Sequence, residues 1–146
     1  MLREATRADI PAMHRVRLAV KENQLTSSVI TEADYEPALE KHGRGWVVEE
    51  NGEVVAFAVG DKRDGNIWAL FVHPSHEGRG HGRQLHEAMV SWLWDQGLQK
   101  LWLTTEANTR AATFYESAGW KRAGTTKEGD LRFELRAPTS GLESRQ

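Results

Sequence analysis

The sequence of 146 residues contains no cysteine. Disulfide bonds, thiolate nucleophiles and zinc–thiolate sites are therefore excluded. Long hydrophobic runs are also absent, since no segment approaches the roughly 18 consecutive apolar residues that a membrane-spanning helix requires. The opening residues, Met1–Glu4, do not lead into the apolar stretch of a secretory signal. We therefore expect a cytoplasmic protein that has no membrane partner.

Neither sign of charge is in large excess. The 19 lysine and arginine residues nearly balance the 21 aspartate and glutamate residues, and the formal net charge is -2. Such a chain lacks the basic field that nonspecific nucleic-acid binding requires, so we expect no nucleic-acid partner. With 39% hydrophobic and 27% charged residues, the composition is that of a soluble globular protein. We predict one domain over residues 1–136 and a flexible tail over residues 137–146.

Two capping-box patterns predict the helices in the first third of the chain. Thr6-x-x-Asp9 precedes apolar residues at helical spacing, which predicts a helix that ends near Lys21. Thr31-x-x-Asp34 predicts a second, weaker helix. Both patterns place an acceptor side chain before the first free N–H groups of a helix.

Three strands are predicted next. The pair Asn51-Gly52 favours a type I′ turn, and apolar segments at 46–48 and 54–59 flank it. A polar, glycine-containing turn then leads into an apolar strand over residues 67–72. Because short turns join these strands, we predict an antiparallel meander.

The second half of the chain alternates between helices and strands. Apolar residues recur at helical spacing from residue 81 to a stop at Gly97. A buried strand at 101–103 follows, and the intervening helix implies that this strand is parallel to the previous one. We expect Asn108 to cap a further short helix and the alternating segment 131–136 to form the last strand. This order of elements predicts an α/β (α+β) domain built on a mixed sheet.

The most informative segment runs from Leu70 to Arg83. An apolar strand ends at Pro74, glycines occupy positions 78, 80 and 82, and a helical pattern begins at once. The N–H groups of such a loop converge near the positive end of a helix, which favours a phosphate. A nucleoside-triphosphate loop would need Lys and then Ser or Thr after Gly82, where this chain has Arg and Gln. A dinucleotide loop of the form G-x-G-x-x-G that starts at Gly80 would need glycine at position 85, where this chain has Leu. A purely structural turn is the other alternative.

A second motif narrows this choice. Residues 108–120 contain the pattern N-x-x-A-x-x-F-Y-x-x-x-G-W. Together with the proline and the glycine loop at 74–82, this pattern resembles the two acyl-CoA motifs of the GCN5-related N-acetyltransferases. The resemblance covers about residues 1–136 and is strongest from Ala69 to Trp120. It implies a mixed central sheet of about seven strands that begins with an antiparallel meander, splays between the fourth and fifth strands and has about four flanking helices.

The resemblance also implies an acetyl-CoA site. The main chain at 70–72 would lie beside the pantetheine arm, as in β-augmentation, and the loop N–H groups would hold the pyrophosphate. Asn108 would contact the pantetheine arm, although a capping role alone explains this residue equally well. The implied cofactor-binding residues are Leu70, Phe71, Val72, Glu77, Gly78, Arg79, Gly80, His81, Gly82, Arg83, Asn108, Ala111, Phe114 and Tyr115.

Three of these residues have roles or departures of their own. Tyr115 corresponds to the general acid of the family, which protonates the CoA thiolate as it leaves; a half-buried core aromatic beside Phe114 is the alternative. Glu77 stands where the family has Gln or Arg, so a negative charge lies near the expected phosphates. His81 replaces an aliphatic residue, and it either contacts a phosphate when protonated or faces solvent.

The general base is left open. His73, Glu49, Glu50 and Glu106 are candidates, and water is another. Ala69 stands at the strand position where related enzymes often have a carboxylate or a histidine, and it cannot accept a proton. The absence of an evident base supports the alternative of a weak or inactive acyl-CoA-binding module.

Four of the six histidines, at positions 73, 76, 81 and 86, gather in the loop and its helix. A metal-dependent hydrolase is therefore a third hypothesis, because imidazole is a good metal ligand. The spacings do not place two of the histidines on one helical face, so we expect no metal.

The favoured function is transfer of an acetyl group from acetyl-CoA to a primary amine, with a homodimer expected only by analogy. The sequence does not identify the acceptor. An acidic group at Glu32, Asp34 and Glu36 either favours a cationic amine or forms a solvated helix face. Trp68 and Trp94 lie near the acceptor cleft or an interface, or pack in the core.

Overall fold

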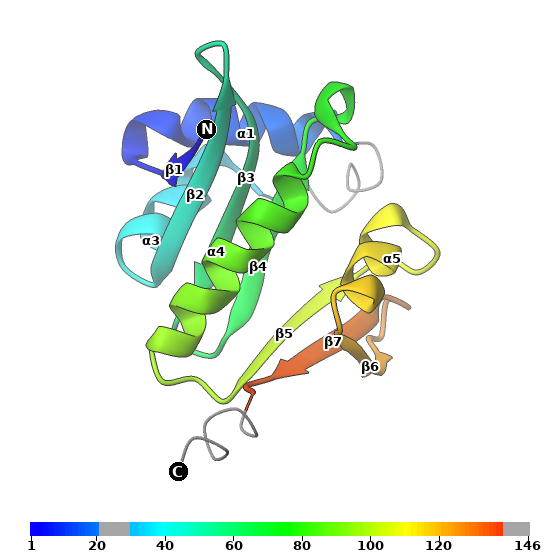
Figure 1. The fold of residues 1–146 in the computed structure, drawn as a ribbon. Coiled ribbons are helices and arrows are strands. Elements are labelled where there is room, and N and C mark those ends of the chain that lie inside the picture. The colour runs from blue at the N-terminus through cyan, green and yellow to red at the C-terminus, as the bar shows by residue number, and fades with distance from the viewer. Residues whose placement is uncertain (21–29, 139–146) are drawn as a thin grey trace.

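A computed structural model describes residues 1–20 and 30–138 of the chain. Within this part, seven strands form one sheet in the spatial order β1-β2-β3-β4-β5-β7-β6 (Figure 1). The strands are β1 (Leu2–Glu4), β2 (Gly43–Glu50), β3 (Glu53–Asp61), β4 (Asn66–Val72), β5 (Lys100–Thr105), β6 (Lys121–Thr125) and β7 (Leu131–Arg136). The α-helices are α1 (Ile10–Ala19), α3 (Tyr35–Glu40), α4 (His81–Asp95) and α5 (Arg110–Ser117). Parallel and antiparallel pairs occur in the same sheet, which confirms the predicted fold class.

Both capping boxes form as predicted. The N–H of Thr6 donates to Asp9 Oδ2 at 2.8 Å, and the N–H of Thr31 donates to Asp34 Oδ2 at 2.7 Å. Each box opens a 3₁₀ turn, Arg7–Asp9 and Glu32–Asp34, and the α-helix begins one residue later. The predicted end of the first helix at Lys21 and the tail from residue 139 onward lie outside the described residues.

Strands β2, β3 and β4 form the predicted antiparallel meander, and β1 pairs antiparallel with the outer edge of β2. The tight turn between β2 and β3 has Asn51 at φ 52° and Gly52 at φ 79°. Positive φ at both central residues defines a type I′ turn, whose twist matches that of the two strands it joins. Asn and Gly tolerate this conformation better than other residues, which is why the pair could be read from the sequence.

The sheet divides between β4 and β5. These strands run parallel, and Asn66 and Trp102 are their one registered pair among the described residues. β4 also contains a bulge: Val59 of β3 lies opposite Ala69, Gly60 lies opposite Ile67, and Trp68 is the extra residue. A bulge bends its strand and increases the local twist, so β4 turns away from β5. The predicted splay between the fourth and fifth strands is confirmed.

Helices cover both faces of the sheet (Figure 1). An apolar cluster lies between the sheet and the helices on each face. On one face, α4 and α5 pack their buried residues against alternate strand residues such as Val48 and Ala56. On the other face, α1 and α3 pack against the intervening residues, such as Val47 and Phe57. This alternation follows from the two-residue period of a strand. No helix among the described residues is long and apolar enough to cross a membrane.

Candidate functional site

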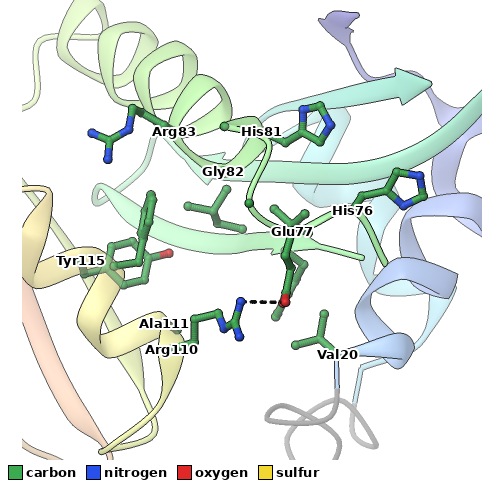
Figure 2. A pocket seen from close by; sticks show the side chains of 15 residues that line it. Val20, His76, Glu77, His81, Gly82, Arg83, Arg110, Ala111 and Tyr115 are labelled. Carbon is green, nitrogen blue, oxygen red and sulfur yellow. Dashed lines mark hydrogen bonds and ion pairs between the residues drawn. The ribbon is translucent and has the colours of Figure 1, made fainter. Parts of the chain in front are cut away.

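A pocket of about 290 Å³ lies where β4 leaves β5 (Figure 2). Its walls come from β4, the glycine loop, the first turn of α4 and one side of α5, with Val20 at the end of α1. Twelve residues that the sequence implied for the cofactor line it: Leu70, Phe71, Val72, Glu77, Gly78, Gly80, His81, Gly82, Arg83, Ala111, Phe114 and Tyr115. Val20, His76 and Arg110 also line the pocket and were not among the implied residues. Arg79 and Asn108 are not part of the lining.

The upper half of β4 presents an unpaired strand edge to this pocket. Leu70, Phe71 and Val72 pair with β3 on one side. On the other side, the ladder to β5 stops after Asn66, so among the described residues no strand pairs with that edge. An unpaired edge offers a row of N–H and C=O groups, and an extended amide-containing chain can add to it as an extra strand.

The glycine loop supplies a second set of backbone donors. Gly78 and Gly80 adopt φ values of 79° and 86°, which residues with a side chain rarely adopt. Gly80 is the N-cap of α4 and gives the helix no side-chain cap. The first N–H groups of a helix have no partner within the helix, and the dipole makes that end positive. The start of α4 is therefore a ready anion site that faces the pocket.

Gly82 is the second residue of α4 and lines the pocket. A Cβ built there would lie 3.7 Å from side-chain atoms of both Val72 and Phe114, which is ordinary contact. Packing within the protein would therefore tolerate alanine at this position. The missing side chain instead leaves room in the pocket between β4 and α5.

The charge of Glu77 is countered by a residue that the sequence reasoning missed. Arg110 Nη1 donates to Glu77 Oε1 at 2.7 Å across the pocket mouth (Figure 2). Arg110 is the first residue of α5, so the second motif brings a cation to the glycine loop. Its position is one of the unspecified places in that motif, and for this reason the pattern gave no signal for it.

His81 does not face solvent, because its side chain is 11% exposed. Its Nε2 lies 2.5 Å from Glu50 Oε2, and Arg79 Nη1 donates to the other oxygen of Glu50 at 2.7 Å. The hydrogen bond with His81, together with the nearby charge of Arg79, holds the pKa of Glu50 below its usual value. The end of β2 thus fixes the glycine loop through one carboxylate.

Tyr115 is buried on α5 and lines the pocket. Its phenol oxygen points toward the middle of the pocket (Figure 2). Its ring packs against Phe114, Trp120 and Phe133. Burial raises the pKa of the phenol above its ordinary value, since the charged form would be poorly solvated. The side chain is more deeply buried than the half-buried aromatic of the alternative reading, and its hydroxyl is protonated at neutral pH.

None of the four candidate bases lines the pocket. Glu49 accepts from Arg3 Nε at 3.1 Å, and this hydrogen bond lowers the pKa of the carboxyl. His73 Nδ1 accepts from the N–H of Ser75. Glu50 binds Arg79 and His81 of the glycine loop, as described above. Water is therefore the one candidate of the sequence analysis that does not require a side chain in the pocket lining.

Asn108 does not cap α5, and the sequence prediction was wrong on this point. The N-cap is Thr109, whose Oγ1 accepts from the N–H of Ala112 at 3.2 Å and donates to the carbonyl of Glu106 at 2.8 Å. Asn108 has φ 60°, a left-handed conformation that asparagine tolerates in turns. Its side chain is exposed.

The four clustered histidines do not converge on one point. His73 and His76 both contact Ser75, and His81 binds Glu50. His86 Nε2 accepts from Trp120 Nε1 at 2.9 Å. Among the described residues no three metal-ligating side chains converge.

The sequence analysis considered two tryptophans and an acidic group for the acceptor site. Trp68 packs edge-on against Tyr35 in the cluster under α1 and α3, and their ring centroids lie 5.1 Å apart. Trp94 packs instead against the core on the α4 face and is not part of the pocket. Glu32, Asp34 and Glu36 are exposed, which fits the solvated helix face of the sequence analysis.

A family model described as the acetyltransferase (GNAT) family matches residues 10–120. The chain belongs to this family. Its sequence is 32% identical over 77 residues to the ribosomal protein bS18-alanine N-acetyltransferase of Escherichia coli K12, a match that covers 51% of this chain and 52% of that protein. The chain thus spans about half the length of the curated relatives it matches.

Solved structures of the same fold extend over nearly the whole chain. An N-acetyltransferase from Staphylococcus aureus Mu50 superposes with a TM-score of 0.78 at 24% identity and covers 93% of this chain and 97% of that one. The PaiA N-acetyltransferase of Thermoplasma acidophilum, solved with coenzyme A, gives 0.74 at 12% identity, with coverage of 94% and 98%. At these identities the likeness shows the fold.

Proposed function

We propose that this protein transfers an acetyl group from acetyl-CoA directly to a primary amine. The observation that carries the proposal is the placement, in one pocket, of an unpaired strand edge and an uncapped glycine-loop helix start. Pantetheine contains two amides and CoA contains a pyrophosphate, so the two features fit the two halves of this one molecule. Membership of an acetyltransferase family supports the same reading.

In this arrangement the N–H groups from Gly78 to Arg83 bind the pyrophosphate, and the backbone of Leu70 to Val72 pairs with the pantetheine arm. Ala111 and Phe114 form the apolar wall on the α5 side. Arg79 and Asn108 lie outside the lining, so we assign them at most contacts with the outer part of the cofactor. The domain that performs the reaction is residues 1–136.

The reaction proceeds by attack of a neutral amine on the thioester carbon. Backbone N–H groups on β4 stabilise the oxyanion of the tetrahedral intermediate. The C–S bond then breaks, the CoA sulfur leaves as a thiolate, and Tyr115 donates its proton to that sulfur. Burial disfavours both the phenolate of Tyr115 and the thiolate of CoA, because the pocket solvates either charge poorly. It therefore raises the pKa of the leaving thiol as well as that of the phenol, and the proton can pass from Tyr115 to the sulfur. Water removes the proton from the amine.

The test is release of free thiol from acetyl-CoA across a panel of primary amines, with acetylated product measured by mass spectrometry. We expect release that depends on the amine, with one acetyl group transferred per thiol. Thiol release without acetylated amine would contradict the proposed transfer.

A second candidate is an acyl-CoA-binding module without catalysis. It is favoured by the absence of the candidate carboxylates and of His73 from the pocket lining. Calorimetric binding of acetyl-CoA, combined with no thiol release for any amine, would support this candidate. A cytoplasmic location and a homodimer stay predictions.

A further inference from the structure

Arg17 is a buried cation on the opposite face of the sheet from α4. It lies on α1 and is 4% exposed. Its guanidinium carbon lies 4.9 Å from the ring centroid of Trp68 and 4.8 Å from that of Phe71, both on β4. The β4 bulge brings these two rings near each other, because it inserts Trp68 as an extra residue.

One edge of this guanidinium is fixed by Tyr35, a residue of α3 with no exposed surface. Arg17 Nε donates to the Tyr35 hydroxyl at 3.0 Å, and that hydroxyl lies 3.1 Å from His14 Nδ1. The hydroxyl therefore accepts from Arg17, and it also hydrogen-bonds with the ring of His14. Tyr35 thus holds the guanidinium in place within the cluster.

The other edge of the guanidinium is unsatisfied. Arg17 Nη2 is buried and has no hydrogen-bond partner, and none of the ion pairs between described residues includes Arg17. The acidic residues next to Tyr35 in the sequence are exposed: Glu32 and Asp34 in the 3₁₀ turn before α3, and Glu36 in α3. A buried charge without a counter-ion is costly, and cation–π contacts offset only part of that cost. An anion that arrives at Nη2 would complete the site.

The guanidinium lies directly behind one wall of the acetyl-CoA pocket. Val20 is one helical turn beyond Arg17 and lines the pocket (Figure 2), and so does Phe71, the residue on whose ring Arg17 stacks. An acceptor whose amine reaches the thioester near Phe71 therefore has Arg17 within the length of a small molecule. Because Arg17 is closed off in the structure, the side chains at this wall must shift on binding, as interface rotamers commonly do.

We propose that Arg17 binds the carboxylate of the acceptor, and that the acceptor is a small molecule with a primary amine and a carboxylate, such as an amino acid. The inference rests on the proposed acetyl transfer. A guanidinium matches a carboxylate in shape and charge. One guanidinium balances one negative charge, which fits a carboxylate better than a phosphate dianion. The rings of Trp68 and Phe71, which lie beside the guanidinium, keep the cation partly dry.

The experiment compares amino acids with the corresponding amino acid amides, which keep the amine and the size but lose the negative charge. For the wild type we expect kcat/KM to be about tenfold or more higher for the acid than for the amide, as for a charged hydrogen bond. In Arg17→Met the preference disappears, with the loss mainly in KM for the acid, while Arg17→Lys retains part of it. Arg15→Gln removes an exposed cation from the same helix and should leave the preference intact.

Two separate controls test whether the variant folds and whether the carboxylate binds in the absence of acetyl transfer. Arg17→Met keeps the volume of the side chain, and thermal unfolding reports whether the variant folds. Thermal shift with the amino acid alone, without acetyl-CoA, measures carboxylate binding even if no acetyl transfer occurs. Equal rates and equal thermal shifts for acids and amides in the wild type would overturn the proposal. So would an Arg17→Met variant that loses activity equally toward both, since that result indicates a structural role.

Discussion

The two faces of the splayed sheet contrast in how they are built. The face with α4 and α5 carries the part of the pocket that we assign to acetyl-CoA, the donor half. It is built largely from backbone: a free strand edge, two glycines with positive φ and a helix start. On the face with α1 and α3, the pocket wall at Val20 and Phe71 is backed by side chains that lie far apart in the sequence. These side chains are Arg17, Tyr35 and Trp68. The donor half is thus suited to one constant molecule, whereas the other half can change its specificity through single side chains. Each prediction that follows tests this division.

The largest expected effect is the loss of turnover when Tyr115 is replaced, because it is the one side chain of the donor half to which we assign a chemical step. Tyr115→Phe removes the proton donor and keeps the ring that packs on Phe114, Trp120 and Phe133. We expect kcat to fall about a hundredfold or more, as for loss of a general acid. The dissociation constant of acetyl-CoA, measured by calorimetry, should stay within a factor of two of the wild type because the backbone supplies the binding. An unchanged kcat would show that the phenol is a packing residue alone.

A smaller effect is expected from strain in the glycine loop. Gly80→Ala places a side chain at φ 86°, at the start of α4, and Gly97→Ala does the same at φ 92°, just beyond the other end of that helix. Neither added Cβ meets a neighbour within 4 Å, so the two substitutions differ mainly in position. Each should cost about 1–2 kcal/mol of stability.

The two glycine variants separate binding from stability. We expect Gly80→Ala to weaken acetyl-CoA binding about tenfold and Gly97→Ala to leave it unchanged, at similar losses in thermal stability. Calorimetric titration and thermal unfolding of the three proteins provide the check. Equal CoA affinity in both variants would mean that the loop conformation is structural and that the phosphates bind elsewhere.

The same contrast explains what could be read from the sequence. Local signals, such as Asn51-Gly52 and the two capping boxes, depend on neighbouring residues, and these predictions were confirmed. Thr109 was missed as the cap of α5 because the neighbouring Asn108 has the higher capping propensity. The strand β6 has five exposed residues and therefore no alternation to detect.

Contacts between distant residues were beyond the sequence patterns. His81 meets Glu50 across 31 positions, and Arg110 meets Glu77 across 33. In the sequence, Arg17 is an ordinary polar residue in the apolar pattern of α1. It is buried in the structure because the β4 bulge and α3 pack around it. Packing in three dimensions decides such sites, whereas the period of a helix or strand does not.

A modest effect is expected from the ion pair at the pocket mouth. Arg110→Gln leaves Glu77 uncompensated beside the expected phosphates and should weaken acetyl-CoA binding about threefold, the size typical of exposed pairs. Adding Glu77→Gln to this variant should restore the affinity. Arg122→Gln breaks an exposed pair with Glu116 beyond the lining and serves as the matched control. If the double variant binds no better than Arg110→Gln alone, then Arg110 acts directly on the phosphates rather than through Glu77.

The smallest effect is a pH dependence of stability within the donor half. Burial lowers the pKa of His86 below its ordinary value of about 6.5, and the neutral ring accepts from Trp120 Nε1 at 2.9 Å. Below pH 6.5 the unfolded chain takes up a proton that the folded protein excludes, so this stability is present above 6.5 and is lost as the pH falls toward the folded-state pKa. Thermal unfolding between pH 7.5 and 5 should show a steeper loss for the wild type than for His86→Gln, whose side chain does not titrate. Parallel curves would mean that His86 is solvated enough to protonate in place, and the packing of α4 against Trp120 would then be looser than the structure indicates.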